Sequence, residues 1–420
     1  MSTKHWITGV LVTAALAGTA QGSELEFHPA IAVNEEYNDN VFYTTHNRVT
    51  DYITHAVPSI TSSYKAPILT VDLNYMLDYM YYANGSVGSN LSHNLTATGK
   101  LTAVENLLYL DASDTYSRVS IDATRDVTMQ SPLAGQVDQN VVNISPYVTL
   151  RPTLKTKVKA GYRYVDIRYN GISGGSAFTS LSVTDHVAFL DTAYEFTSKW
   201  SATGGYSFTL QQSGADEYHQ HQGNVGFRYE YSNKSFLFGQ AGYTWTKFNN
   251  NRSLDDLFWN AGFTHTFDTV TATVNTGVTY TEDPLLLSTI QNKNASISLD
   301  KTFPVGSMGL SFNYSEITAA ESKMLLTRMY GGKIQGGYEF TSDLKGNVGF
   351  TAEKYDNETI PGGTATTYTR RFLVNSGFTY QLGDQFSVSL NYIYVDSHSP
   401  GIPTDNASVN RVTLALAKTF

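Results

Sequence analysis

Apolar and polar residues alternate with a period of two over most of the chain. Within 200–211, Tyr206 and Phe208 lie on an apolar parity, whereas Ser207 and Thr209 lie on a polar one. Successive side chains of a β-strand point to opposite faces of its sheet, so the alternation predicts strands with one apolar and one polar face. The same alternation recurs over 224–231, 270–280, 372–382 and 386–394. Because no helical period of comparable length competes with it, the chain is predicted to be all-β.

The connections between these strand candidates alternate between tight and long. Tight turns rich in Gly, Pro, Asn and Asp are expected at 65–67, 104–106, 151–153, 197–198, 233–234, 268–269, 304–306, 341–343 and 383–384. Longer polar loops are expected near 37–50, 83–90, 118–137, 170–181, 213–218, 249–253, 283–290, 319–327, 357–367 and 398–405. Together they separate about twenty strands, with eighteen as the alternative count. Such alternation is typical of a transmembrane antiparallel β-barrel with short periplasmic turns and longer extracellular loops.

Strand length and aromatic placement favour a membrane barrel over a soluble β-propeller, which shares this hairpin period. The strands can run for roughly 11–14 residues, enough to cross a bilayer at a tilt of about 45°. Tyrosines mark the ends of the apolar parity, as at Tyr79, Tyr81, Tyr392 and Tyr394. Aromatic girdles lie at bilayer interfaces, and a closed barrel leaves no unpaired peptide group in hydrocarbon.

The first twenty residues have the features of a secretory signal peptide. Lys4 precedes an apolar run from Trp6 to Leu16, and small residues follow up to Ala20, where cleavage is expected. An N-terminal anchor is the alternative. Residues 21–420 are then expected to form one barrel domain. Its first strand is expected to begin within about six residues of the cleavage site, which leaves no room for an N-terminal plug.

The C-terminal segment resembles the signal that the barrel assembly machinery reads. Leu414, Leu416 and the terminal Phe420 share one apolar parity. Lys418 departs from the pattern, although a lysine side chain can extend along an apolar surface to reach the interface. We therefore expect outer-membrane lipid and this machinery to be partners of the chain.

The amino-acid composition excludes several other classes of protein. Charged residues make up 15% of the chain, aromatic residues 13%, and cysteine is absent. A disordered chain would be richer in charge and poorer in aromatic residues. Disulfide scaffolds, cysteine metal sites and lipoproteins anchored through an N-terminal cysteine all need cysteine. The formal net charge of −9 argues against a nucleic-acid partner.

A motif after the first strand resembles a known family. The segment Glu36–Phe42 reads EYNDNVF, Asp51–Ile53 follows as D-x-I, and Pro58 lies in the second strand. Together with Leu107–Ala112 and Tyr116–Arg118, these residues resemble the β-barrel porin 2 family, whose barrels are associated with exopolysaccharide and PEP-CTERM exosortase systems. The resemblance implies an outer-membrane barrel with a role in polysaccharide or surface-protein export. It supplies no catalytic residues.

Histidines are the first candidates for catalytic or metal chemistry. His219 and His221 lie on one face of a strand and could hold a metal, but no third ligand is identifiable, so solvated histidines at a loop edge are favoured. His55 and His186 are expected to face the interior singly. No cofactor and no enzymatic function are predicted.

Two acidic motifs have simpler interpretations. The segment Asn38–Asn40 could be a fragment of a calcium loop, but it lacks the further acidic spacing, so an Asx-type turn is favoured. The pair Asp255–Asp256 lies too far from His265 to form a site with it at the rim.

Charges on the polar parity are more informative about function. A ring of lumenal charge could orient a polar solute as it passes. Cross-strand salt bridges that brace the wall are the alternative, with Lys157 or Lys159 paired to Asp191. The candidates are Lys155, Lys157, Lys159, Arg163, Asp72, Asp78, Asp111, Asp191 and Glu195.

The predicted width of the barrel limits the functions that it can have. Twenty strands tilted by about 40° enclose a backbone diameter of roughly 40 Å, which side chains alone do not fill. Loop 118–137 could fold inward as a constriction or lie outside as a lid. The sequence therefore predicts a porin or an export conduit for polar solute, with exopolysaccharide as a candidate. The alternative is a non-conducting barrel that anchors a surface or periplasmic assembly.

Overall fold

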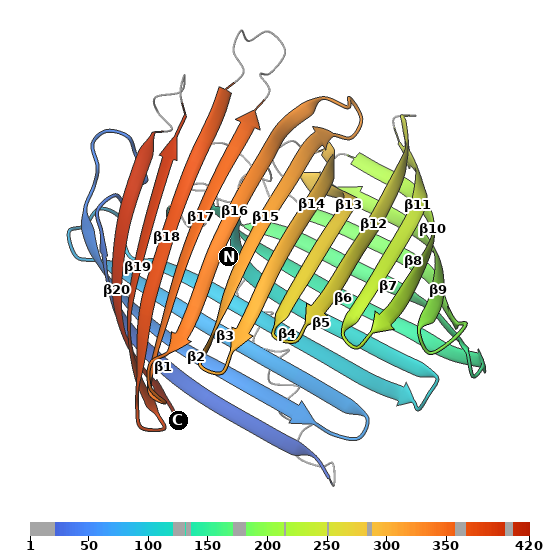
Figure 1. Cartoon of the computed structure of the whole chain (residues 1–420), viewed down its shortest axis with the longest axis horizontal. Coiled ribbons are helices and arrows are strands. Elements are labelled where there is room, and N and C mark those ends of the chain that lie inside the picture. The colour runs from blue at the N-terminus through green and yellow to red at the C-terminus, as the bar shows by residue number, and fades with distance from the viewer. Residues whose placement is uncertain are drawn as a thin grey trace.

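Twenty antiparallel strands form one closed barrel (Figure 1). The computed structural model describes residues 22–120, 131, 136–170, 182–213, 216–249, 252–283, 288–357, 367–399 and 406–420. The expected signal peptide lies outside the described residues. Each strand pairs with its neighbours in the chain, and β20 pairs back onto β1, which closes the wall. The predicted all-β barrel and its count of twenty strands are confirmed, and the alternative count of eighteen is wrong.

The strands are long enough to cross a bilayer obliquely. Their bounds are β1 (Glu24–Asn38), β2 (Asp51–Lys65), β3 (Leu69–Tyr82), β4 (Asn90–Val104), β5 (Leu108–Ser120), β6 (Gln136–Thr153), β7 (Thr156–Asn170), β8 (Ser182–Glu195), β9 (Trp200–Ser213), β10 (Asp216–Ser232), β11 (Ser235–Phe248), β12 (Ser253–Phe267), β13 (Val270–Asp283), β14 (Ser288–Phe303), β15 (Gly306–Ala319), β16 (Leu325–Glu339), β17 (Leu344–Asn357), β18 (Thr367–Leu382), β19 (Phe386–His398) and β20 (Ala407–Thr419). None of the described residues forms a helix with the length and hydropathy needed to span a membrane.

Tight turns gather at one end of the barrel, at the bottom of Figure 1. Several have a residue with positive φ where the chain reverses, including Asn106, Lys234, Asp268 and Gly383. Asn, Asp and Gly tolerate this backbone conformation, so the turn composition read from the sequence has a direct structural cause. The longer connections that the structure describes, such as 39–50 and 83–89, lie at the opposite end (Figure 1).

The two parities of each strand face different surroundings. On β20, Leu414 and Leu416 expose 53% and 50% of their surface on the outer face of the wall. Large outward apolar side chains recur on the other strands, and exposed apolar area on this scale is typical of a surface that contacts lipid. The opposite parity carries the polar and charged side chains that face the interior.

Contacts between β1 and β20 seal the barrel near its extracellular end. The Asp39 carboxylate accepts hydrogen bonds from the backbone N and the Nδ2 of Asn410, at 2.7 and 2.8 Å. Asn38 Oδ1 accepts a hydrogen bond from the backbone N of Asn40, at 3.0 Å, which forms an Asx turn. The Asx interpretation of this motif is therefore confirmed.

One seam of the wall is only half paired. β12 pairs with β13 from Asn260 to Phe267, whereas its upper residues 253–259 have no ladder partner on that side among the described residues. β13 keeps its full pairing with β14. The connection 320–324 between β15 and β16 reaches across this seam, because Lys323 Nζ binds Asp256 at 2.5 Å and Arg252 binds Glu321.

Candidate functional site

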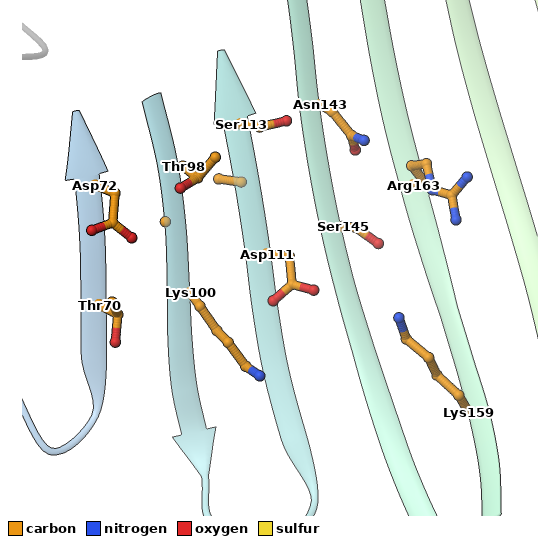
Figure 2. A pocket seen from close by; sticks show the side chains of 12 residues that line it. Thr70, Asp72, Thr98, Lys100, Asp111, Ser113, Asn143, Ser145, Lys159 and Arg163 are labelled. Carbon is orange, nitrogen blue, oxygen red and sulfur yellow. The ribbon is translucent and has the colours of Figure 1, made fainter. Parts of the chain in front are cut away.

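A polar cavity of about 550 Å³ lies on the interior face of β3–β7, in the half of the barrel nearer the tight turns (Figure 2). Strand register brings its residues together. Lys100 is directly opposite Asp111, and Asp72 is directly opposite Thr98. Figure 2 shows these side chains and those of Lys159 and Arg163 on the same face of the wall.

The charges around this cavity are not neutralised by ion pairing. Ser63 Oγ donates to Asp72 at 2.7 Å, and the Tyr147 hydroxyl donates to Asp111 at 3.4 Å. The Lys159 ammonium lies 3.8 Å from the centre of the Tyr147 ring, a cation–π arrangement. Within the described part of the chain, no ion pair within 4.0 Å includes any member of the unpaired lumenal cluster. That cluster is Asp72, Lys100, Asp111, Lys159 and Arg163.

A smaller cavity of about 350 Å³ continues this surface toward the tight turns and is lined by cations. Lys157 and Lys159 line it as predicted, and the structure adds Lys100 and Arg151. Lys100 was not among the predicted lumenal charges although it shares a parity with Thr96 and Thr98, because it is a single cation on an otherwise uncharged strand face. Arg151 was overlooked because the residue was assigned to a turn, whereas β6 continues to Thr153.

Two predictions about the lumenal charges are wrong. Lys155 was expected on the interior face of a strand, but it lies in the turn between β6 and β7 and its Nζ donates to the Phe196 carbonyl at 3.2 Å. Lys159 does face Asp191 in register, yet no ion pair joins Asp191 to Lys157 or Lys159 among the described residues. The Lys159 side chain instead lies over the ring of Tyr147 on β6, on the side away from Asp191 on β8. Glu195 ends β8 on the same parity as Asp191, at the rim.

The remaining acidic candidate, Asp78, has a specific partner. His55 Nδ1 lies 2.9 Å from Asp78 Oδ1 on the interior face. Beside this pair, Val41, Ile53 and Met80 form a buried apolar cluster near the extracellular end. His55 therefore faces inward as expected, but it is not alone.

His186 faces outward, contrary to expectation. Its Nδ1 lies 2.5 Å from the hydroxyl of the outward-facing Tyr162. The prediction failed because a one-residue difference in parity moves a side chain to the other face of a strand. The same tyrosine–histidine contact recurs at Tyr75–His93, Tyr206–His221 and Tyr231–His265, with distances of 2.7–2.8 Å.

His219 and His221 share one face of β10, as predicted, and this face is the outer one. Phe208 lies against both imidazole rings, with ring centroids 6.1 and 5.0 Å away. The described residues contain no group of three or more side chains placed to hold a metal ion. Asp256 contacts Lys323 near the extracellular end, far along β12 from His265.

The expected assembly residues lie on the outer wall. Leu414, Leu416 and Phe420 are all strongly exposed there, and the Phe420 backbone N donates to the Pro29 carbonyl at 2.9 Å. Lys418 Nζ lies 4.5 Å from the centre of the Phe420 ring. Lys418 therefore interrupts the run of apolar residues on this face, but its ammonium lies beside the terminal aromatic ring.

Most of loop 118–137 falls outside the described residues, so its inward or outward position stays a prediction. Arg118 and Asp138, at its two ends, belong to β5 and β6 and pair at 2.9 Å. Ser131 is buried, and its Oγ donates to the Val41 carbonyl at 2.7 Å.

A second large cavity, of about 500 Å³, was not anticipated from the sequence. It lies nearer the extracellular end, against the interior face of β7–β12 and the adjoining ends of β13 and β14, and its walls carry aromatic rings and amides in place of opposed charges. Its residues come from eight strands, so no local motif could have identified it.

Comparison with known proteins identifies the fold. No protein-family model matches the chain, and no curated protein matches it. The chain is similar to the FrpB iron transporter from Neisseria meningitidis (F5-1 variant), with a TM-score of 0.55, 10% identity, and coverage of 94% of this chain and 82% of that chain. For the copper transporter OprC these values are 0.58, 8%, 96% and 81%.

The ferric enterobactin receptor (PfeA) mutant from Pseudomonas aeruginosa is also similar, with a TM-score of 0.52 and 9% identity over 94% of this chain and 80% of that chain. Identities this low establish the architecture alone. The fold is that of outer-membrane β-barrels.

Proposed function

We propose that this protein is an outer-membrane pore that conducts a polar solute, as a porin or as an export conduit. The observation that carries the proposal is the unpaired lumenal cluster. An ionised side chain that is removed from water without a partner costs several kcal/mol, so these five charges require a hydrated interior. A barrel wall of twenty strands is wide enough for such an interior.

The arrangement of the cluster suits transport of a polar molecule. Asp72 and Asp111 supply negative charge on β3 and β5, and Lys159 and Arg163 supply positive charge on β7. Opposed charges on one wall create a lateral field that orients dipoles and hydroxylated solutes. Salt bridges would have cancelled this field, and within the described residues the cluster contains none.

Exopolysaccharide is the cargo that we propose within this function. The resemblance of Glu36–Phe42 to the β-barrel porin 2 family supports it. A hydrated lumen with scattered charge is compatible with a long hydroxylated chain, and the similar solved structures include proteins named as transporters.

Conductance tests the proposal. Purified full-length protein inserted in a planar bilayer is expected to give discrete ohmic current steps, because a hydrated lumen of this width carries ions. Protein unfolded by heating is the control. Electrically silent insertion of folded barrels would refute the pore and favour a barrel that anchors an assembly.

A further inference from the structure

The cavity of about 500 Å³ near the extracellular end has the composition of a ligand site. Aromatic rings and hydrogen-bonding side chains converge on it from separate strands. Binding sites for small molecules combine a largely apolar lining with a few placed polar groups. The residues that matter here are Tyr169, Asp185, Gln211, Tyr218, Phe258 and Tyr280.

Strand register places three of these residues side by side. Gln211 on β9 lies directly opposite Asp185 on β8 and directly opposite Tyr218 on β10. Tyr218 in turn packs against Phe248 on β11, with ring centroids 5.4 Å apart. A carboxylate, an amide and an aromatic ring thus form a continuous row across the wall, which we call the acceptor row (Asp185, Gln211 and Tyr218).

Two oxygens of the acceptor row have no hydrogen-bond partner among the described residues. They are Asp185 Oδ1 and Gln211 Oε1, and both are buried atoms of residues that line the cavity. Gln211 is only 3% exposed. Leaving a buried acceptor unsatisfied costs about 1–3 kcal/mol, and natural proteins contain few such groups. Two on adjacent strands of one cavity therefore need an explanation.

The opposite side of the cavity comes from the half-paired seam. The cavity is lined on this side by Val278, Thr279 and Tyr280 of β13. These residues follow Gly277, the last residue of β13 that pairs with β12. The Tyr280 hydroxyl is held by the Leu257 carbonyl at 3.3 Å and by Gln291 Nε2, so its ring has a defined position. The cavity thus lies between the acceptor row on β8–β10 and an aromatic ring held at the seam between β12 and β13.

We propose that this cavity binds one or more units of a neutral saccharide. A sugar ring has an apolar face that packs on aromatic rings and a rim of hydroxyl donors that satisfy Asp185 Oδ1 and Gln211 Oε1. Both oxygens are acceptors and one belongs to a carboxylate, so an anionic sugar would place like charges together. The proposal rests on the pore function above, because a solute must reach this depth of the lumen.

Calorimetric titration of the full-length protein in detergent tests the site without measuring current. The probes are maltohexaose and cellohexaose, which are neutral, and the galacturonate hexamer, which is anionic. Saturable binding of a neutral hexamer is expected, with at least tenfold weaker binding of the galacturonate hexamer. Binding of neither neutral hexamer, or preference for galacturonate, would overturn the proposal.

Paired variants locate the binding. D185V and Q211L are each expected to weaken binding of the neutral hexamer at least tenfold, because each removes one free acceptor. Asp191 lies on the same strand and interior parity outside this cavity, and Gln240 is a lumenal glutamine outside it, so D191V and Q240L are matched controls expected to stay within twofold.

Stability separates recognition from a structural role. Because neither oxygen has a protein partner, Q211L is expected to unfold at the wild-type temperature or above it. Unchanged hexamer affinity in both folded variants would refute the site. If the protein binds a neutral hexamer but carries no current, the pore proposal fails and the saccharide site stands. If the protein conducts but binds no neutral hexamer, the saccharide site is refuted and the pore proposal stands.

Discussion

The two large cavities of the lumen are built by the same wall but have opposite chemistry. The cavity on β3–β7 is surrounded by unpaired charges with short polar residues between them, such as Ser113 and Ser145. The cavity on β7–β14 is surrounded by rings, amides and one carboxylate. Charges without partners require water and act over distance, whereas unpartnered acceptors beside rings act on a molecule in contact. The first cavity is suited to steering a solute and the second to holding it.

Glycines create space for the aromatic rings in both places. A Cβ on Gly161 would lie 2.6 Å from Tyr147 Cβ and 2.8 Å from Phe189 Cζ, next to the Lys159 ammonium. A Cβ on Gly242 would lie 2.3 Å from Phe258 Cζ. Beside each cavity, aromatic side chains thus occupy the space that a Cβ on a neighbouring glycine would fill.

The largest expected effect comes from reversing charge in the first cavity. The double variant K159E/R163E turns two cations into anions beside Asp72 and Asp111. The ratio of potassium to chloride permeability, measured from reversal potentials under a salt gradient, is expected to rise at least threefold. The shift should shrink in 1 M salt, where the Debye length is about 3 Å.

A matched control changes the same charge on the outer wall. Lys354 and Arg370 lie beside the ring of Tyr368, with their charged groups 5.6 and 5.2 Å from its centre. K354E/R370E should leave ion selectivity unchanged. Equal selectivity in the lumenal double variant and the wild type would contradict the steering role of the first cavity.

A smaller effect is expected from filling the space beneath a ring of the second cavity. In G242V the added carbons would also meet the Gly223 carbonyl oxygen, 2.4 Å from the Cβ position, so backbone must move. Overpacking of this kind costs about 1–3 kcal/mol. Thermal unfolding followed by circular dichroism should show a lower midpoint.

The control for this variant is G88A, since nothing lies within 4 Å of a Cβ at that position. It should unfold at the wild-type temperature. If G242V also unfolds at the wild-type temperature, Gly242 is not needed to make space for the ring of Phe258. The proposed role of glycine in the second cavity would then be wrong.

The smallest effect is expected from releasing the connection that crosses the seam. D256N removes the carboxylate that binds Lys323, an ion pair with one partner half-exposed, worth about 0.2–1 kcal/mol. Amide hydrogen exchange in 319–324 should accelerate by a few-fold. Asp255 faces away on the other parity of β12, so D255N should leave exchange unchanged, and equal acceleration in both would contradict a specific clasp.

Local pattern explains how much of the first cavity could be anticipated. Asp72, Asp111, Lys159 and Arg163 were assigned to the interior because strand parity is a property of neighbouring residues. Lys155 was misplaced because the turn was expected at 151–153, whereas β6 continues to Thr153 and β7 begins only at Thr156, and His186 was misplaced because its parity was assigned wrongly. Boundaries and parity near strand ends depend on tertiary pairing, which a local pattern does not contain.

The acceptor row could not have been anticipated in the same way. Asp185, Gln211 and Tyr218 are unremarkable in their own strands, and they meet only because register aligns three strands to the residue. Neither β12 nor β13 contains a sequence pattern that would predict the seam between them. The seam depends on where the hydrogen-bonded pairing of the two strands ends, which is a property of the tertiary structure.

The amino-acid sequence by itself determined the strands, their turns, the outward apolar face and the closed barrel that these require. The reason is that alternation and turn chemistry are local, and hydrocarbon tolerates no open sheet edge. The tertiary structure decided which interior residues meet, which charges stay unpaired and where the wall opens its ladder. Those outcomes depend on the register of strands far apart in the chain, where a shift of one residue replaces every neighbour.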